Sequence, residues 1–144
     1  MSRAETGGKI FDRCNCAQSV IAAFSEDYGL EKDKALSVAA GFGGGIGRLQ
    51  ETCGAVTGAI MILGLASDFR DGDSRDKLNM IYDKTRSFID DFRQEKGTVN
   101  CRELLGCDLM SEEGHKYFVE NNLRENCRVY VKYACELLEK YLSR

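Results

Sequence analysis

The sequence contains no proline and few residues that alternate as they would in β-strands. Apolar residues recur instead at helical spacing along most of the chain, which favours an all-α fold. We predict a single-domain helical bundle of about five to six helices with a glycine-rich loop. The domain is expected to span residues 1–144, with residues 1–9 flexible.

Long basic runs and long apolar runs are also missing. With 20 basic against 23 acidic residues, the formal net charge is −3, so nucleic acid is not an expected partner. The longest uncharged stretch, residues 52–67, is shorter than the ~20 residues that a bilayer span needs, so the chain is expected not to span a membrane. Residues 1–9 have no apolar segment of a signal peptide, which favours the reducing cytoplasm, where free thiols or metal thiolates are the default.

Several catalytic motifs are absent. The single histidine, His115, is read as an ordinary surface residue, and no G-x-S-x-G elbow exists, so hydrolase chemistry is poorly supported. No C-x-x-C occurs, which argues against a zinc finger or a thioredoxin motif. The glycine-rich residues 41–47 match neither the G-x-G-x-x-G nor the Gly-Lys-Ser/Thr phosphate loops, so no nucleotide motif is present.

Cysteine is what the chain does have, and four of its seven cysteines directly follow an Asn or Thr. Asn and Thr cap helix N-termini, where the helix dipole pushes a thiol toward the reactive thiolate. The four pairs are Asn15-Cys16, Thr52-Cys53, Asn100-Cys101 and Asn126-Cys127. Gln18 and Glu103 add capping-box signals to the first and third pairs, whereas the last helix could begin as early as residue 121.

The expected helices follow from apolar spacing and from glycine stops. They cover residues 16–28, 33–40, 53–69, 74–96, 101–105 and 124–142, and residues 111–119 are of doubtful order. Two readings of residues 41–47 stay open. Gly43, Gly44 and Gly45 are candidates to bind an anion or a cluster sulfur through backbone N–H groups, or the segment is only a tight reversal between helices.

The segment after that loop carries a second pattern. Gly54 and Gly58 lie one helical turn apart, which would let another backbone approach closely. Cys53 precedes them at the mouth of the loop, where we expect incomplete burial and a reactive thiol. The neighbouring Glu51 carboxylate would oppose thiolate formation.

Cys16, the run Cys53-Gly54-Ala55-Val56-Thr57-Gly58, Cys101 and Cys127 follow one another in an order that resembles the C_GCAxxG_C_C family. The resemblance covers nearly the whole chain. It implies a redox role for the four cysteines, and genes of the family often lie near transporter genes. Related domains in split-Soret cytochromes make an iron–sulfur role conceivable, but the C-x-x-C-H needed for haem attachment is absent, so haem is not expected. Three further thiols, Cys14, Cys107 and Cys135, depart from the four-cysteine pattern.

Two hypotheses result. In the first, Cys16, Cys53, Cys101 and Cys127 converge in a redox or electron-transfer protein, as dithiol–disulfide pairs or as ligands of zinc or an iron–sulfur cluster. The metal variant is favoured slightly in a reducing cell. A redox partner or a transporter-associated protein would then be the partner, and a homo-oligomer is compatible with the sequence. In the second, the chain is a non-catalytic binding module whose glycine loop holds an anion or a partner helix, with buried structural cysteines.

Overall fold

In a computed structural model, residues 1–143 are described, and they form eight α-helices, two short 3-10 helices and no β-strand. The chain builds α1 (Arg3–Ile10), α2 (Cys16–Phe24), α3 (Lys32–Ala39), α4 (Gly54–Ser67), α5 (Arg75–Lys96), α6 (Cys101–Leu105), α7 (Glu112–Glu120) and α8 (Arg124–Leu142). The 3-10 helices η1 (Ser25–Tyr28) and η2 (Ala40–Phe42) follow α2 and α3. The all-α prediction is confirmed.

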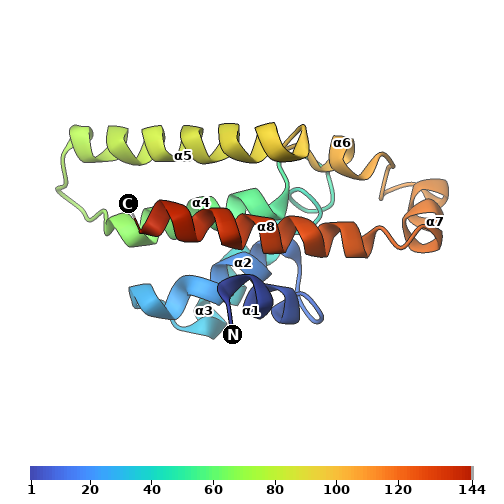
Figure 1. The fold of residues 1–144 in the computed structure, drawn as a ribbon, viewed down its shortest axis with the longest axis horizontal. Helices are drawn as coiled ribbons and strands as arrows, with labels where there is room; N and C mark the ends of the chain where they lie inside the picture. Colours follow the sequence, from blue (N-terminus) through green and yellow to red (C-terminus); the bar gives the residue numbers. More distant parts are fainter. Residues whose placement is uncertain (144) are drawn as a thin grey trace.

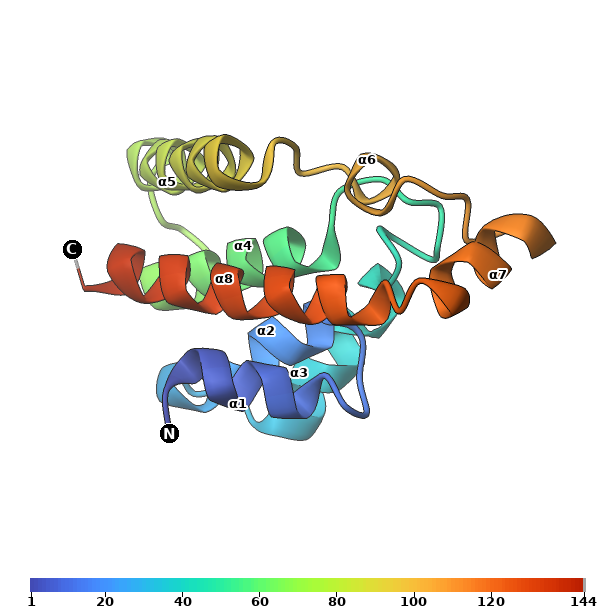
Figure 2. The same ribbon diagram turned by 45° about the vertical axis from the view of Figure 1, so that its right-hand side comes forward.

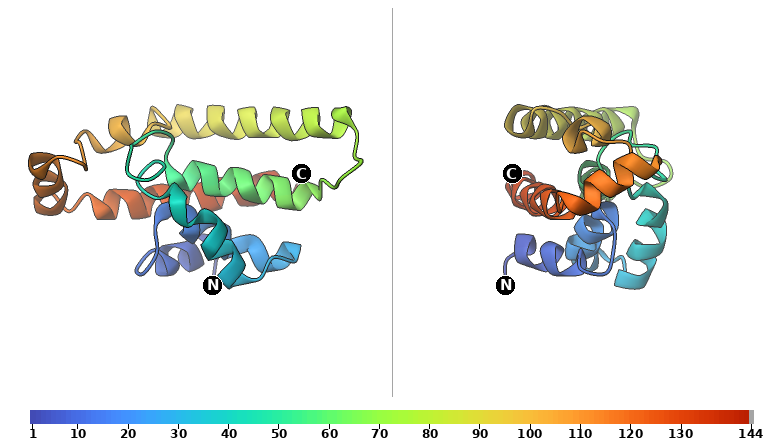
Figure 3. Two further views of the ribbon diagram at one scale, coloured as in Figure 1. Left: turned by 180° about the vertical axis from the view of Figure 1, so that it is seen from behind. Right: turned by 90° about the vertical axis from the view of Figure 1, so that its right-hand side faces the viewer.

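The helices lie in three layers (Figure 1). Helix α5 forms one outer layer, α4 and α8 run side by side in the middle, and α1 to α3 form the opposite layer, as the end-on view in Figure 3 also shows. Helix α2 contacts α1, α3, α4 and α8, so it lies at the centre of the packing. The short helices α6 and α7 extend beyond the bundle at the end where α8 begins (Figure 2).

The core follows the apolar stripes of these helices. Ile21 of α2, Ile62 of α4, Phe88 and Phe92 of α5, and Leu138 of α8 are all at most 1% exposed. Burying such a side chain contributes about 1.5–3 kcal/mol, so the contacts of α4 with α2 and α8 supply much of the stability. Within residues 1–143, no helix is both long enough and apolar enough to cross a membrane.

Two helices were missed by the sequence interpretation, so the count of five to six is wrong. The first is α1: the Ser2 side chain accepts a hydrogen bond from the Glu5 N–H, and the helix packs on α8 through the buried Gly7 and Gly8. Segment 111–119 also forms a helix, α7, capped by Ser111. Both helices are short, with eight and nine residues, and two turns of apolar spacing are too few to identify a helix from the sequence alone.

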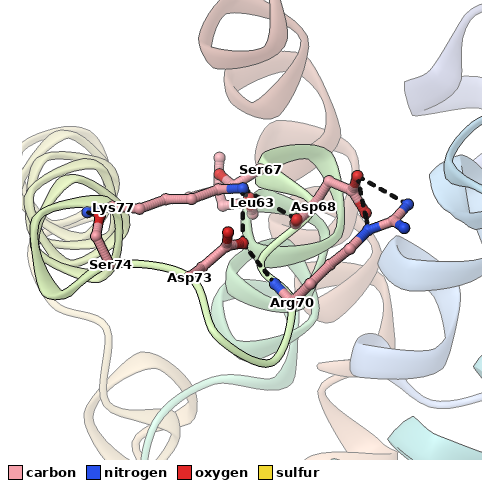
Figure 4. Close-up of polar contacts among 7 residues, drawn as sticks. All are labelled: Leu63, Ser67, Asp68, Arg70, Asp73, Ser74 and Lys77. Atoms are coloured by element: carbon pink, nitrogen blue, oxygen red, sulfur yellow. Dashed lines mark hydrogen bonds and ion pairs between the residues drawn. The ribbon is translucent and has the colours of Figure 1, made fainter.

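The connection between α4 and α5 is held by polar contacts (Figure 4). Asp68 ends α4 in a left-handed conformation, with φ of 53°. The Asp73 carboxylate accepts hydrogen bonds from the Arg70 N–H and from Lys77 Nζ, at 2.7 and 2.9 Å. Lys77 Nζ also donates to the Asp68 carbonyl, so these contacts orient the start of α5.

Candidate thiol site

Four helix starts meet at the end of the bundle where α6 and α7 lie. The cysteines at these starts, Cys16, Cys53, Cys101 and Cys127, all line one pocket of about 120 Å³. The remaining lining residues are Phe11, Asn15, Gly44, Gly45, Arg48, Gly54, Leu104, Leu105, Leu109, Phe118, Arg124 and Tyr130. The structure therefore brings together the four predicted thiols, and all seven cysteines of the chain are free.

The start of α2 has the predicted capping box. The Asn15 side chain accepts a hydrogen bond from the Gln18 N–H, and the Gln18 side chain accepts one from the Asn15 N–H, both at 2.9 Å. Asn15 Nδ2 also donates to the Ala40 carbonyl, which ties this cap to the end of α3. Cys16 is thereby fixed as the first residue of α2.

At α4 the prediction was wrong by one residue. Cys53 itself, and not Thr52, is the N-cap of the helix. The Cys53 side chain makes no capping hydrogen bond, but the backbone N–H groups of Ala55 and Val56 in the first turn lower the pKa of its thiol. Cys53 is 4% exposed, so the expected incomplete burial is also wrong.

Two glycines of α4 bring Cys16 close to Cys53. A Cβ at Gly58 would lie 2.7 Å from the Ala17 carbonyl oxygen, and one at Gly54 would lie 2.9 Å from the Ala17 nitrogen. The close backbone approach predicted from the glycine spacing is therefore confirmed, and its partner is α2.

Cys101 is positioned by a short antiparallel pairing of the two segments that precede α4 and α6. Thr52 and Asn100 form an isolated β-bridge. The Cys53 N–H donates to the Val99 carbonyl, and the Cys101 N–H donates to the Glu51 carbonyl, both at 2.7 Å. The predicted cap is present as well: the Asn100 side chain accepts a hydrogen bond from the N–H three residues on.

Cys127 lies in the first turn of α8 but does not follow a cap. Helix α8 begins at Arg124 with Leu123 as its N-cap, so Asn126 is a helical residue and not the predicted cap. Because α8 starts at Arg124 and not after Asn126, Arg124 lies one turn before Cys127. Both residues line the pocket.

The glycine loop reaches the same pocket through an unusual backbone. Gly44, Gly45, Ile46, Gly47 and Arg48 all have positive φ, between 57° and 70°. A non-glycine residue in this conformation costs roughly 1–2 kcal/mol, so Ile46 and Arg48 are strained. Of the three predicted glycines, Gly44 and Gly45 line the thiol pocket, whereas Gly43 lies behind it, against the Asn15 side chain.

Gln50 was not singled out from the sequence, yet it organises one wall of the site. It is 3% exposed, and its amide donates to the Cys107 carbonyl and accepts from the Leu109 N–H, both at 2.8 Å. The same amide hydrogen-bonds the Cys101 thiol. A buried glutamine after a glycine-rich run is the signal that could have revealed it, because buried amides need hydrogen-bond partners.

Cys16, Cys53 and Cys127 form a hydrogen-bonded group. The Cys16 thiol bonds Cys127 and Cys53, and these bonds raise the pKa of Cys16 well above its ordinary value. The bond from Cys16 lowers the pKa of Cys53 despite burial, and the N–H groups of the first turn of α4 lower it further. The bond from Cys16 likewise lowers the pKa of Cys127, with help from the Arg124 charge. Cys16 is therefore the proton donor, and the other two sulfurs are the candidate thiolates.

Burial disfavours the thiolate of three further cysteines, Cys101, Cys107 and Cys135. Burial is the main cause that raises the pKa of Cys101 to about 12, which disfavours its thiolate despite the cap at Asn100. Burial also raises the pKa of Cys107, and it raises that of Cys135 to about 12. Cys135 lies outside the pocket, against Gly7 of α1, and Cys14 lines a different surface hollow.

A metal centre needs several donors directed at one point. Within residues 1–143, no group of three or more His, Cys, Asp or Glu side chains is arranged to hold a metal ion. The zinc or iron–sulfur variant therefore has no geometric support among these residues, whereas four thiols that line one pocket suit thiol chemistry.

Comparison with known proteins agrees with the cysteine pattern. The model of one family, described as "Putative redox-active protein (C_GCAxxG_C_C)", matches residues 14–141. No curated protein and no solved structure matches the chain. The match spans all seven cysteines and every residue that lines the pocket except Phe11, and the description of the family supports a redox role. The chain belongs to the C_GCAxxG_C_C family.

Proposed function

We propose that the protein is a thiol–disulfide redox protein in which Cys53 is the attacking thiolate and Cys16 the resolving thiol. The observation that supports this most directly is that Cys16 and Cys53 line one pocket, where contact with Cys16 and the N–H groups of the first turn of α4 lower the pKa of Cys53. A thiolate is the nucleophile in disulfide exchange, and a neighbouring thiol completes the disulfide.

Cys53 is preferred over Cys127 as the nucleophile for a geometric reason. The single S–H of Cys16 can donate to only one sulfur at a time, so the two candidates compete for it. Cys53 has two further donors, the N–H groups of Ala55 and Val56. A charge on Cys53 also raises the pKa of Cys127, which disfavours a second thiolate beside the first.

The test is oxidation of the folded, reduced protein with one equivalent of diamide, followed by peptide mass spectrometry. We expect a disulfide between Cys16 and Cys53 that dithiothreitol reverses. Cys53→Ala should abolish this reaction. Cys14→Ala removes a thiol outside the pocket and should leave it unchanged.

Two results would count against the proposal. If the folded protein resisted diamide and formed disulfides only in denaturant, the cysteines would be structural. If Cys16 paired with Cys127 in the parent protein, the assignment of Cys53 as the attacking residue would be wrong.

A further inference from the structure

The walls of the thiol pocket carry positive charge and no negative charge. Arg48 and Arg124 both line it, and among residues 1–143 no Asp or Glu does. Neither arginine forms an ion pair with a carboxylate of the described residues. Arg124 donates a hydrogen bond to the Phe11 carbonyl, and its guanidinium carbon lies 4.2 Å from the centroid of the Phe11 ring. The Arg48 side chain has no such partner among the described residues.

The glycine loop adds neutral donors to the same wall. The N–H groups of residues 46 to 51 are all used by carbonyls within the loop. The N–H groups of Gly44 and Gly45 make no hydrogen bond to any described residue, although both glycines line the pocket. Unpaired N–H groups of consecutive left-handed residues, beside an unpaired guanidinium, are donors suited to an anion.

The rest of the pocket is apolar and small. Leu104, Leu105, Leu109 and Phe118 face the sulfurs across about 120 Å³, less than the roughly 150 Å³ of a cavity that accommodates benzene. Such a volume admits one short arm of a ligand.

From these observations we infer that the substrate is a low-molecular-weight disulfide whose arms end in a carboxylate, which Arg48 and the N–H groups of Gly44 and Gly45 recognise. The inference rests on the proposed thiol–disulfide function. The substrate is the oxidant, so no further co-reactant is needed.

The exchange balances in two steps. The Cys53 thiolate attacks one sulfur of the disulfide RSSR, the S–S bond breaks, and RS⁻ leaves as the mixed disulfide Cys53–S–S–R forms. The Cys16 thiol then loses its proton to the departing thiolate, and its sulfur attacks that of Cys53. The second RS⁻ leaves and takes a proton from water. Two protein thiols are oxidised and one disulfide is reduced to two thiols, with transfer of two electrons.

Three disulfides of matched length test the inference: the carboxylate bis(2-carboxyethyl) disulfide, the neutral bis(2-hydroxyethyl) disulfide and the cationic bis(2-aminoethyl) disulfide. For each disulfide, the rate of oxidation of the reduced protein is divided by the rate of oxidation of dithiothreitol by the same disulfide. This ratio corrects for differences in the intrinsic reactivity of the three disulfides. We expect the order carboxylate, neutral, cationic. The net charge of −3 would favour the reverse order, so this preference would have to come from the pocket.

Variants localise the effect. Arg48→Gln should slow the carboxylate disulfide about threefold or more relative to the neutral one, as expected for a partly exposed charge pair. Arg48→Lys should restore part of the rate. Arg13→Gln removes the same charge from an exposed residue outside the pocket and should have no selective effect.

The outcomes separate this inference from the proposed function. Equal normalised rates for the three disulfides, all abolished by Cys53→Ala, would overturn anion recognition and leave the redox role intact. Failure of every disulfide to react at Cys53 would overturn both.

Discussion

Gly58 of α4 lies directly against Ala17 of α2: a Cβ on Gly58 would lie 2.7 Å from the Ala17 carbonyl oxygen. This contact has a chemical consequence, because Ala17 follows Cys16 and Gly58 lies on the helix that Cys53 caps. The distance between the two helices therefore sets the distance between the two sulfurs. Gly54 and Gly58, the glycines of the run Cys53-Gly54-Ala55-Val56-Thr57-Gly58, thus have a physical role of their own, in addition to the chemical role of Cys53.

The first prediction concerns that contact. Gly58→Ala should force α2 and α4 apart, lower the free energy of unfolding by about 1–3 kcal/mol and slow formation of the Cys16–Cys53 disulfide. Gly64→Ala is the matched control, since Gly64 lies on the same helix with nothing within 4 Å of its Cβ position. That control should be stabilised by roughly 0.5–1 kcal/mol. Urea unfolding and diamide oxidation measure both effects, and equal behaviour of the two variants would contradict the prediction.

The second prediction concerns Cys16, whose thiol contacts Cys53 and Cys127 and lowers their pKa values. Cys16→Ala removes the hydrogen bond that lowers the pKa of Cys53, so this pKa should rise. Cys16→Ser retains an O–H donor and should leave the pKa nearer that of the parent protein. The pH dependence of iodoacetamide labelling at Cys53, followed by peptide mass spectrometry, reports the shift. Identical profiles for the alanine and serine variants would mean that hydrogen bonding from residue 16 does not control the thiolate.

The sequence was sufficient to predict the fold class because apolar spacing and capping residues are local signals. Asn15 and Asn100 cap their helices as expected, since each has a good partner three residues on. Thr52 does not cap α4 because it forms a β-bridge with Asn100. The two residues are about 50 positions apart in the sequence, so no local pattern reveals this pairing. Asn126 does not cap α8 because the helix begins at Arg124, the start that the apolar spacing predicted, which leaves Asn126 inside the first turn.

The chemistry of the individual thiols was less predictable. A helix N-terminus favours a thiolate, but burial opposes it, and burial depends on tertiary packing. Cys101 has the better local cap, yet burial raises its pKa to about 12. Thr52 does not cap the helix before Cys53, yet the Cys16 thiol of α2 and the N–H groups of Ala55 and Val56 lower the pKa of Cys53. Only the structure shows which thiols share a proton.

The third prediction is a pH dependence of stability. Burial raises the pKa of Cys135 to about 12, compared with about 8.5 for an unfolded thiol. Between these values the folded chain keeps a proton that the unfolded chain loses, so stability falls as pH rises. Cys135→Ala removes this contribution. The free energy of unfolding of the parent protein should fall more steeply than that of the variant between pH 9 and 11, by about 1.4 kcal/mol per pH unit. Parallel curves in urea titrations would show that Cys135 does not retain its proton.

The last prediction separates backbone strain from contact with the thiols. Gly45 and Gly47 both have positive φ, 69° and 57°, so valine at either position is strained. Only at Gly45 would the new Cβ meet the site, 2.7 Å from the Cys101 Cβ and 2.8 Å from the Gln50 Cα. At Gly47 nothing lies within 4 Å.

Both Gly45→Val and Gly47→Val should therefore lower the melting temperature, but only Gly45→Val should shift the reduction potential of the cysteine pair. The physical reason is that Gly45→Val displaces Cys101, which lines the pocket beside Cys53, and Gln50, whose amide contacts Cys101. A titration in dithiothreitol redox buffers, read by thiol labelling, gives the potential of each variant beside the parent protein. If Gly45→Val lost stability with an unchanged potential, the loop would be only a turn between helices. If Gly47→Val shifted the potential equally, strain in the loop, and not contact with the thiols, would govern the site.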